Sequence, residues 1–320
     1  MQRMEVVIMK NQCCMMCESK KFRKVYFFVS DNNIHHSDLV QCLDCGHHYS
    51  IFKDTSNLAA LYEDKQYKVI DTRGSLSDYI VLADSKRILW SIEKLTGPTP
   101  RLLDFGCGKG TFMNIARNQG WETKGVETAE SRAHFAKNIF DLDVDTGLYE
   151  SGSIDDTPFD VITLFHVVEH LPHPKRLLKN LVDHNLKDGG LVVIEVPLYE
   201  SFQSLLAKQK WIHIDHHYHL SHFSEDTLDR LVNYLGLSVV KKEYNSFHVG
   251  VVGMTQSIAS LLGYRGMLIH DLKFSRTRKL LVMLALVAPF ALIAEIVSSY
   301  LKHGGVIRVY CKKIGNPPNK

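Results

Sequence analysis

The sequence of 320 residues has no block of like charge. Its 38 lysines and arginines are spread among 35 aspartates and glutamates, and the formal net charge is only +3. A nucleic-acid surface needs cations gathered in one patch, where they replace the counterions of the phosphate backbone. The charge distribution therefore does not indicate a nucleic acid as a partner.

The sequence also has little that resembles a targeting segment at its start. The apolar run before Lys10 is too short to be the hydrophobic region of a secretory signal peptide. We therefore expect a cytoplasmic protein. At this length the chain can bury one full α/β domain and still have residues left for accessory segments.

Cysteines are few, and four of the seven form two close pairs. In a reducing compartment, pairs spaced in this way predict metal ligation rather than disulfides. Four thiolates complete the tetrahedral shell of a structural Zn²⁺ and leave no open position for catalysis. We predict a zinc ribbon in residues 1–53, with four ligands: Cys14, Cys17, Cys42 and Cys45.

Other residues beside these pairs are also candidate ligands. Cys13 could serve as the first ligand, and His47 or His48 could replace one thiolate. The aromatic and β-branched residues at 25–29 predict a strand in the same segment. The segment is therefore expected to be a small β element, either with zinc or with reduced cysteines.

A glycine-rich turn follows a short apolar stretch in the first third of the chain. Its pattern, Asp-x-Gly-x-Gly-x-Gly, is formed by Asp104, Gly106, Gly108 and Gly110. Glycines allow backbone angles that a side chain would forbid, and they let a ligand touch the backbone. Glu127 ends the next apolar stretch about 20 residues on, the spacing of a carboxylate that binds ribose hydroxyls. Together these residues predict a site for a nucleoside cofactor.

Asp104 narrows the choice of cofactor. A carboxylate beside the loop disfavours a pyrophosphate and suits a cofactor with a cationic amino-acid end. The segment resembles motif I of the class I S-adenosylmethionine-dependent methyltransferases. The resemblance implies that S-adenosyl-L-methionine is the cofactor and that Glu127 is its ribose-binding acid.

Strands and helices alternate after Arg101, which predicts a doubly wound α/β sheet of parallel strands joined by right-handed crossovers. The resemblance implies a seven-stranded Rossmann-like methyltransferase sheet whose last strand pairs antiparallel with the sixth. Beyond the first two strands, we expect a helix near 173–186 and strands at 159–164, 189–197, 237–241 and 304–311.

The chain divides accordingly into five parts. After the ribbon-like segment, residues 54–98 are expected to form a helical connector that lies over the cofactor site. The methyltransferase core is expected at 99–250, a helical insertion at 251–303, and the last strand and a tail at 304–320.

The insertion contains an apolar run at 280–294, interrupted by Pro289. This run is shorter than the roughly 20 residues that span a bilayer as a helix. A single crossing would also separate two strands that are expected in one sheet. We expect either a buried or hinged hairpin, or a surface helix that gives peripheral membrane contact through 273–302. Four basic residues lie beside the run: Lys273, Arg276, Arg278 and Lys279.

Residues 165–174 follow the expected fourth strand, at the edge where ligands bind in open α/β sheets. The pair Glu169 and His170, before a proline-containing turn, resembles a motif of the methyltransferase branch that includes the ubiquinone-biosynthesis O-methyltransferases. The resemblance implies that Phe165 and His166 lie beside the methionine portion of the cofactor. His170 is either a catalytic residue or a structural hydrogen-bond partner in the turn.

Five of the 17 histidines fall within 213–222. The cluster has neither the His-Glu-x-x-His spacing of a helical metal site nor a matching second group of ligands, so we predict no metal there. Residues 219–224, with the pattern His-Leu-x-x-Phe-Ser, resemble an element of the same branch whose loop faces the acceptor. His219 is the first candidate for a general base, with His217 and Asp215 assisting or binding substrate.

Methyl transfer from a sulfonium is an in-line displacement with an activated donor, so the protein mainly aligns the acceptor and excludes water. A hydroxyl acceptor must lose its proton, and a neutral histidine can take it. We therefore predict a methyltransferase acting on a small molecule, with O-methylation of a sugar, lipid-linked or natural-product intermediate favoured. Two alternatives stay open: a non-catalytic scaffold, and a protein methyltransferase that docks its target through the zinc ribbon.

Overall fold

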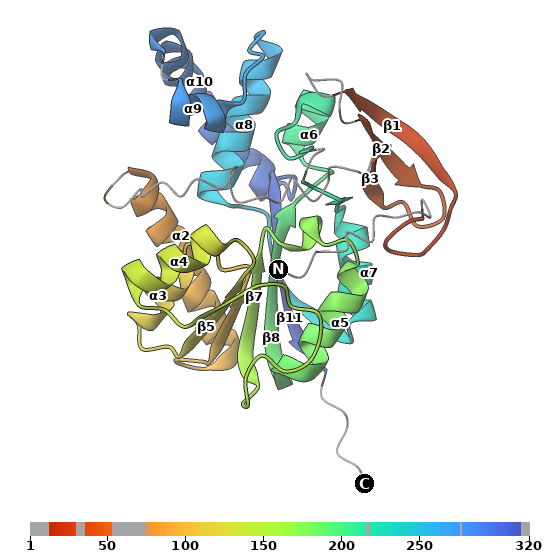
Figure 1. Cartoon of the computed structure of the whole chain (residues 1–320). Coiled ribbons are helices and arrows are strands. Elements are labelled where there is room, and N and C mark those ends of the chain that lie inside the picture. Colours follow the sequence, from red (N-terminus) through yellow and green to blue (C-terminus); the bar gives the residue numbers. More distant parts are fainter. Residues whose placement is uncertain are drawn as a thin grey trace.

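The computed structural model describes residues 13–29, 36–52, 74, 76–215, 218–275 and 277–314. Its main element is a seven-stranded sheet in the order β10-β11-β8-β7-β4-β5-β6 (Figure 1). The strands in chain order are β4 (Leu102–Phe105), β5 (Thr123–Glu127), β6 (Val144–Thr146), β7 (Phe159–Phe165), β8 (Leu186–Pro197), β10 (Leu237–Glu243) and β11 (Val306–Lys313).

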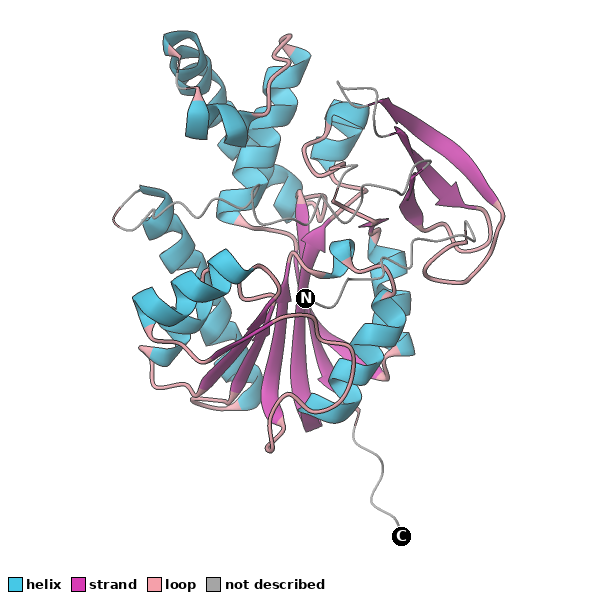
Figure 2. Cartoon of the chain, viewed as in Figure 1, coloured by secondary structure: helices cyan, strands magenta, loops and turns pink. Residues whose placement is uncertain are grey.

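The pairing directions confirm the predicted fold class. Strands β6, β5, β4, β7 and β8 are parallel to one another, whereas β11 runs antiparallel to both β8 and β10. The last strand therefore pairs antiparallel with the sixth, as the resemblance implied, and the structure places it between the fifth and the sixth. Parallel strands need crossovers that cover both faces of a sheet, and Figure 2 shows helices on both sides.

Side chains of the central strands alternate between two buried clusters, one on each face. On β4, Leu102 packs into the first cluster and Leu103 into the second, and β8 shows the same alternation. The first cluster lies under α2 (Leu76–Thr96) and α3 (Thr111–Arg117), which carry Ile88 and Ile115 into it. Because both faces are covered, these strands read as continuous apolar runs.

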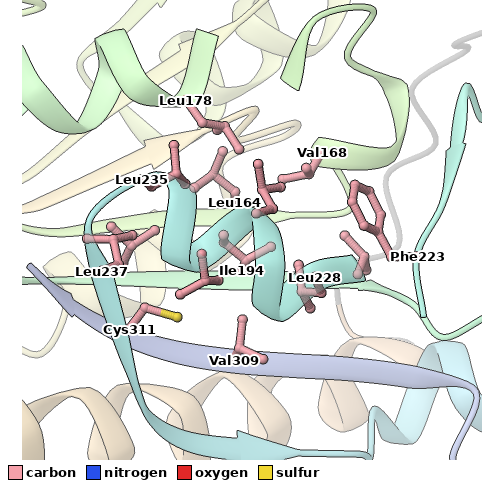
Figure 3. Packing of buried hydrophobic residues seen from close by; sticks show 14 of the residues in the cluster. Leu164, Val168, Leu178, Ile194, Phe223, Leu228, Leu235, Leu237, Val309 and Cys311 are labelled. Carbon is pink, nitrogen blue, oxygen red and sulfur yellow. The ribbon is translucent and has the colours of Figure 1, made fainter. Parts of the chain in front are cut away.

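The second cluster lies under α5 (Pro174–Asn185) and α7 (Glu225–Tyr234). Figure 3 shows Leu228 of α7 packed over Ile194 of β8 and Val309 of β11. Helix α7 begins with a capping box formed by Ser224 and Thr227, which fixes the chain that enters it. A further helix, α4 (Glu130–Phe140), packs beside α3 and β6.

The expected connector is only partly described. Residues 53–73 and 75 lie outside the described part of the chain, and α2 is the helix that follows them. Helix α2 packs on a face of the sheet through Leu89 and Ile92. The position of the connector over the cofactor site stays a prediction.

The N-terminal segment forms a second sheet with the order β1-β2-β3-β9. Its first three strands are β1 (Phe22–Val29), β2 (His36–Cys42) and β3 (His48–Phe52). The fourth strand, β9 (Ser221–His222), comes from the histidine-rich segment and pairs antiparallel with β3. The ribbon is thus joined to the core, and Tyr49 lies in the same buried cluster as Phe223.

The insertion consists of three helices, α8 (Phe247–Leu261), α9 (Leu268–Phe274) and α10 (Arg278–Tyr300). They project beyond the sheet next to α6 (Phe202–Ala207), as Figure 1 shows. Within the described residues, α10 alone is long and apolar enough to cross a membrane by length and composition. The length expected from the apolar run was too short, because the helix continues through Pro289 and includes 23 residues.

Candidate functional site

The glycine loop joins β4 to α3 and has the conformation that its sequence demands. Gly106, Gly108 and Gly110 have φ angles of 79°, 56° and 74°. A methyl group on Gly106 would lie 2.4 Å from Cγ2 of Val167, so this glycine lets the segment after β7 approach the loop. A methyl group on Gly108 would meet no atom of the described chain within 4 Å, which leaves space beside this backbone for a ligand.

Glu127 closes the loop from the end of β5. One carboxylate oxygen accepts a hydrogen bond from the backbone N–H of Gly108 at 2.7 Å, and the other accepts from Ala129 at 2.8 Å. The second oxygen also accepts from the hydroxyl of Thr128 at 3.4 Å, whereas the oxygen bonded to Gly108 has a further lone pair that a ribose hydroxyl could use. Glu127 therefore holds the loop in shape and stands where the predicted ribose contact requires it.

Asp104 lies beneath the loop and is almost fully buried. Its carboxylate accepts a hydrogen bond of 2.7 Å from the hydroxyl of Thr163 on β7. Burial raises the pKa of Asp104 to about 7, opposed by this hydrogen bond and helped by the nearby charge of Glu127. Burial destabilises the ionised form of this carboxyl, and a cation beside it would stabilise that form. Asp104 therefore fits a cationic ligand, such as the amino-acid end of S-adenosyl-L-methionine.

Phe165 ends β7 and His166 follows it, at the same edge of the sheet. The ring of Phe165 packs edge-on against Phe112 of α3, with 4.9 Å between the centroids. His166 adopts a left-handed backbone conformation, φ 55°, which turns the chain sharply after the strand. Its ring lies between two carboxylates, with Nδ1 3.3 Å from Glu169 and Nε2 3.0 Å from Glu195.

His166 is held in its charged form. Burial disfavours the charge, but Glu169 and Glu195 outweigh it and raise the pKa of His166 to about 10. Burial likewise opposes the charge of Glu169, yet His166 lowers its pKa to about 2. The segment after β7 is thus fixed by ion pairs and not only by the turn.

These ion pairs continue into the core. Arg308 of β11 is buried and pairs with Glu195 of β8, with Asp84 of α2 at 3.4 Å and with Glu243 of β10 at 2.9 Å. Arg308 of the last strand is therefore linked to His166 through the carboxylate of Glu195. Sequence reasoning missed this connection, because its members are far apart in the chain.

Glu169, His170 and His219 come together at the same edge. The short 3₁₀ helix η2 (Val168–His170) carries the first two, and their ligand atoms and that of His219 lie within 4.8 Å of one another. The two imidazole rings are in edge-to-face contact, with 4.7 Å between centroids. The prediction that the histidine cluster has no matching partner group is corrected here, since Glu169 and His170 supply one. These three side chains could also share a metal ion.

His219 is held in a defined tautomer. Its Nδ1 lies 2.8 Å from the carbonyl oxygen of His213, and because a carbonyl can only accept, Nδ1 must be the donor. His170 makes the equivalent bond to the carbonyl of Tyr218 at 3.0 Å. In the neutral form, each ring therefore presents an unprotonated Nε2.

The pKa of His219 is lowered by its burial and by the neighbouring His170, which keeps the ring neutral at physiological pH. A neutral imidazole beside an ionised Glu169 can accept a proton, and the carboxylate would stabilise the imidazolium. The structure thus brings together two of the candidate catalytic residues, His219 and His170. Asp215 lies in the same segment, and its backbone carbonyl accepts from the N–H of His219 at 2.7 Å. His217, the third predicted catalytic residue, lies outside the described residues.

The four predicted zinc ligands also come together. The sulfur atoms of Cys14 and Cys45 are 3.5 Å apart, as are those of Cys17 and Cys42, and all four lie within 4.8 Å. A tetrahedral Zn²⁺ with Zn–S bonds of about 2.3 Å separates its sulfurs by about 3.8 Å, so the arrangement fits this ion.

The alternative zinc ligands are placed elsewhere. Cys13 does not belong to the group of four thiols. His47 is buried with Nε2 3.3 Å from the hydroxyl of Ser221, and His48 stacks on Tyr199 with 4.1 Å between ring centroids. The two histidines thus connect the ribbon to the core instead of completing the metal site.

Comparison with known proteins agrees with this geometry. A family described as a methyltransferase domain matches residues 85–242, which include the glycine loop, the segment after β7 and the histidine-rich segment. The ubiquinone biosynthesis O-methyltransferase of Coxiella burnetii is 30% identical over 114 residues, which are 34% of this chain and 48% of that protein. The protein of the same description from Maricaulis maris is 30% identical over 109 residues, 31% and 42% of the two chains. The chain thus spans about half the length of the curated relatives it matches.

Solved structures with a similar fold include a SAM-dependent methyltransferase from Archaeoglobus fulgidus. It is 23% identical, with a TM-score of 0.46 and coverage of 76% of this chain and 96% of that one. A possible histamine N-methyltransferase from Thermotoga maritima is 18% identical, with a TM-score of 0.44 and coverage of 74% and 91%. Residues 85–242 thus match a methyltransferase domain family, and the sheet order and the acid-and-glycine loop agree with an S-adenosylmethionine-dependent methyltransferase.

Proposed function

We propose that this protein transfers a methyl group from S-adenosyl-L-methionine to a hydroxyl oxygen of a small molecule. The observation that carries this proposal is the joint presence, at one edge of the sheet, of the cofactor loop and an oriented histidine pair, His170 and His219. The two parts are in contact, because Gly106 of the loop packs on Val167, two residues before Glu169.

The cofactor would supply an activated methyl group when bound. Asp104 would hold its cationic end and Glu127 its ribose, while Phe165 and His166 would lie beside its methionine portion. Because Gly108 leaves open space at the loop, the backbone itself would contact the cofactor.

His219 would act on the acceptor as a general base. An acceptor hydroxyl loses its proton as the new bond to carbon forms, and the unprotonated Nε2 of neutral His219 can receive that proton. His170 and Glu169 would stabilise the charge that results. An amine acceptor would not need this arrangement, and for that reason we favour oxygen.

The ribbon would have a structural role. Four thiolates around Zn²⁺ leave no position for a substrate, so the ion would stabilise the ribbon and not take part in the reaction. The ribbon contacts the histidine-rich segment through the pairing of β3 with β9. This placement supports a role in shaping the acceptor side rather than in docking a protein target.

The proposal can be tested before the acceptor is identified. The protein is incubated with donor labelled on its methyl group and an extract of host cells, which is then separated into protein precipitate, organic phase and aqueous phase. We expect label in the organic phase, or in aqueous products separated from the unreacted donor, and its loss in Asp104→Asn and His219→Gln. Label in the protein precipitate would support a protein methyltransferase, and cofactor binding without any transfer would support a scaffold.

A further inference from the structure

Helix α10 is apolar on two opposite faces. One face packs against α8 and buries Leu280, Val287 and Ala291. The opposite face carries a stripe of exposed side chains at helical spacing, with Leu286 66% and Phe290 72% exposed. The stripe also includes Val282, Ile293 and Val297.

A helix that is apolar all round is normally enclosed in a protein core or surrounded by lipid. Only 22% of the most apolar 18-residue window of α10 is buried. The helix is therefore not a core helix, and its exposed stripe lacks an apolar environment within the described chain. Exposed Leu262 and Met267, near the turn between α8 and α9, extend the apolar surface at the outer end of the projection.

Cations border this surface. Arg278 and Lys279 stand at the start of α10 and flank a groove of about 500 Å³ with apolar walls that include Val282 and Leu286. Arg265 is exposed between α8 and α9. None of these three cations pairs with a carboxylate of the described residues. The insertion has two acids, of which Asp271 accepts a hydrogen bond from Tyr264 and Glu295 is buried.

The inner end of the projection is fixed to the core. Glu295 accepts hydrogen bonds from the backbone N–H of Gly305 at 2.9 Å and from the side chain of Gln203 at 2.6 Å. Gln203 also donates to the carbonyl of Gly250 in α8. Strands β10 and β11 flank the insertion and pair within one sheet, so they lie on the same side of a bilayer. A single crossing by α10 would place them on opposite sides, and α10 therefore does not span the membrane alone.

We propose that the outer part of the α8–α10 projection lies in the surface of a bilayer that contains anionic lipids. The exposed stripe of α10 would enter the acyl region, and Arg265, Arg278 and Lys279 would meet the phosphates. A second copy of the chain is a poorer occupant, because a symmetric contact would bring the same unpaired cations together.

The projection starts beside the candidate site. A methyl group on Gly253 of α8 would lie 3.3 Å from Nε2 of His213, the residue whose carbonyl orients His219. A protein docked in this way would hold its acceptor side near the bilayer. If the proposed function is right, this position suits a lipid-linked acceptor.

The experiment is flotation of the full-length protein with vesicles, which needs neither cofactor nor acceptor. Vesicles of phosphatidylcholine are compared with vesicles in which a quarter of the lipid is phosphatidylglycerol. We expect binding to the anionic vesicles, weakened by salt. Leu286→Asp and the double change Arg278→Gln with Lys279→Gln should each weaken binding by about tenfold.

Two matched controls separate docking from loss of folding. Ile314 is 65% exposed, as Leu286 is 66% exposed, but it follows the last residue of β11, whereas the chain just before β11 contacts the projection through Gly305, so Ile314→Asp should bind normally. Changing the adjacent exposed Lys20 and Lys21 to Gln tests a general effect of charge. Absence of vesicle binding by the unaltered protein, or equal loss in the controls, would overturn the proposal. A dimer that Leu286→Asp dissociates, without vesicle binding, would show that a second copy covers this face.

Discussion

The hydroxyl of Ser50 donates a hydrogen bond of 2.9 Å to the backbone carbonyl of His219. Ser50 belongs to β3 of the ribbon, and its backbone N–H also donates to the carbonyl of Leu220 at 3.0 Å. His222, two residues beyond Leu220, lies 3.2 Å from the same hydroxyl through Nε2. The N-terminal ribbon therefore holds the backbone of the candidate general base.

This contact predicts that Ser50→Ala lowers methyl transfer without weakening cofactor binding. The loss of the hydrogen bond from Ser50 to the backbone of His219 should reduce turnover about tenfold, which is about 1.4 kcal/mol in activation free energy. Steady-state kinetics and calorimetric titration of the cofactor would be measured together. Ser238→Ala, on β10, is the control and should leave both unchanged. A parallel loss of cofactor affinity in Ser50→Ala would contradict a role confined to the acceptor side.

The cysteine cluster predicts a specific metal content. Cys42→Ser should lose bound zinc and lower the melting temperature, because binding of a structural ion adds to folding stability. Cys13→Ser should keep the zinc, since Cys13 lies outside the group of four thiols. Elemental analysis of the purified proteins, with thermal unfolding, makes the comparison. Equal zinc in the two variants would rule out the assigned ligands.

The pKa of Asp104 predicts a pH-dependent cofactor affinity. Burial raises this pKa to about 7, and the cationic ligand requires the ionised carboxylate. As pH falls below 7, the fraction of ionised Asp104 decreases, and the dissociation constant should rise by about tenfold per pH unit. Asp104→Asn should bind weakly and show a flat profile between pH 5.5 and 8 (roughly the range set by this pKa). An unaltered profile in the variant would assign the titration to another group.

The same shift affects stability with a defined sign. The folded protein holds a proton on Asp104 over the range between its ordinary pKa and about 7, where the unfolded chain has released it. Asp104 therefore lowers stability as pH rises through this window. Asp104→Asn should remove that contribution, which chemical unfolding at the two ends of the window would detect.

The glycine loop predicts two distinct defects. Gly106→Ala places a methyl group 2.4 Å from Val167, at a φ of 79°, and should destabilise the fold by about 1–3 kcal/mol. The added methyl group in Gly108→Ala meets no atom of the described residues within 4 Å, so this change should cost less stability but still impair cofactor binding. Denaturant unfolding and calorimetry separate the two effects. Adding Val167→Ala to Gly106→Ala should recover part of the stability, and failure to do so would show that backbone strain dominates.

Much of the fold could be predicted, because its signals are local. Apolar runs that end in a glycine loop, an acid one strand later, and alternating strands and helices identified the sheet and its edge. The paired cysteines likewise marked four thiols that do come together. Each of these patterns depends on residues close together in the sequence.

The relationships that complete the site could not be read in this way. Ser50 and His219 are 169 residues apart, and His170 and His219 are 49 apart. The support of His166 by Arg308 through Glu195 joins three strands or their ends. Such contacts follow from the packing of distant segments, for which no periodicity or spacing gives a signal.

Calorimetric titration of S-adenosyl-L-methionine into the folded protein, beside Glu127→Ala, tests the central claim most directly. We predict micromolar binding (on the order of −8 kcal/mol) by the unaltered chain. Binding should be lost or weakened at least tenfold in the variant, in which Gly108 loses its carboxylate partner and the ribose its acceptor. No detectable binding by the folded, zinc-loaded protein would contradict the assignment and leave the sheet as a scaffold.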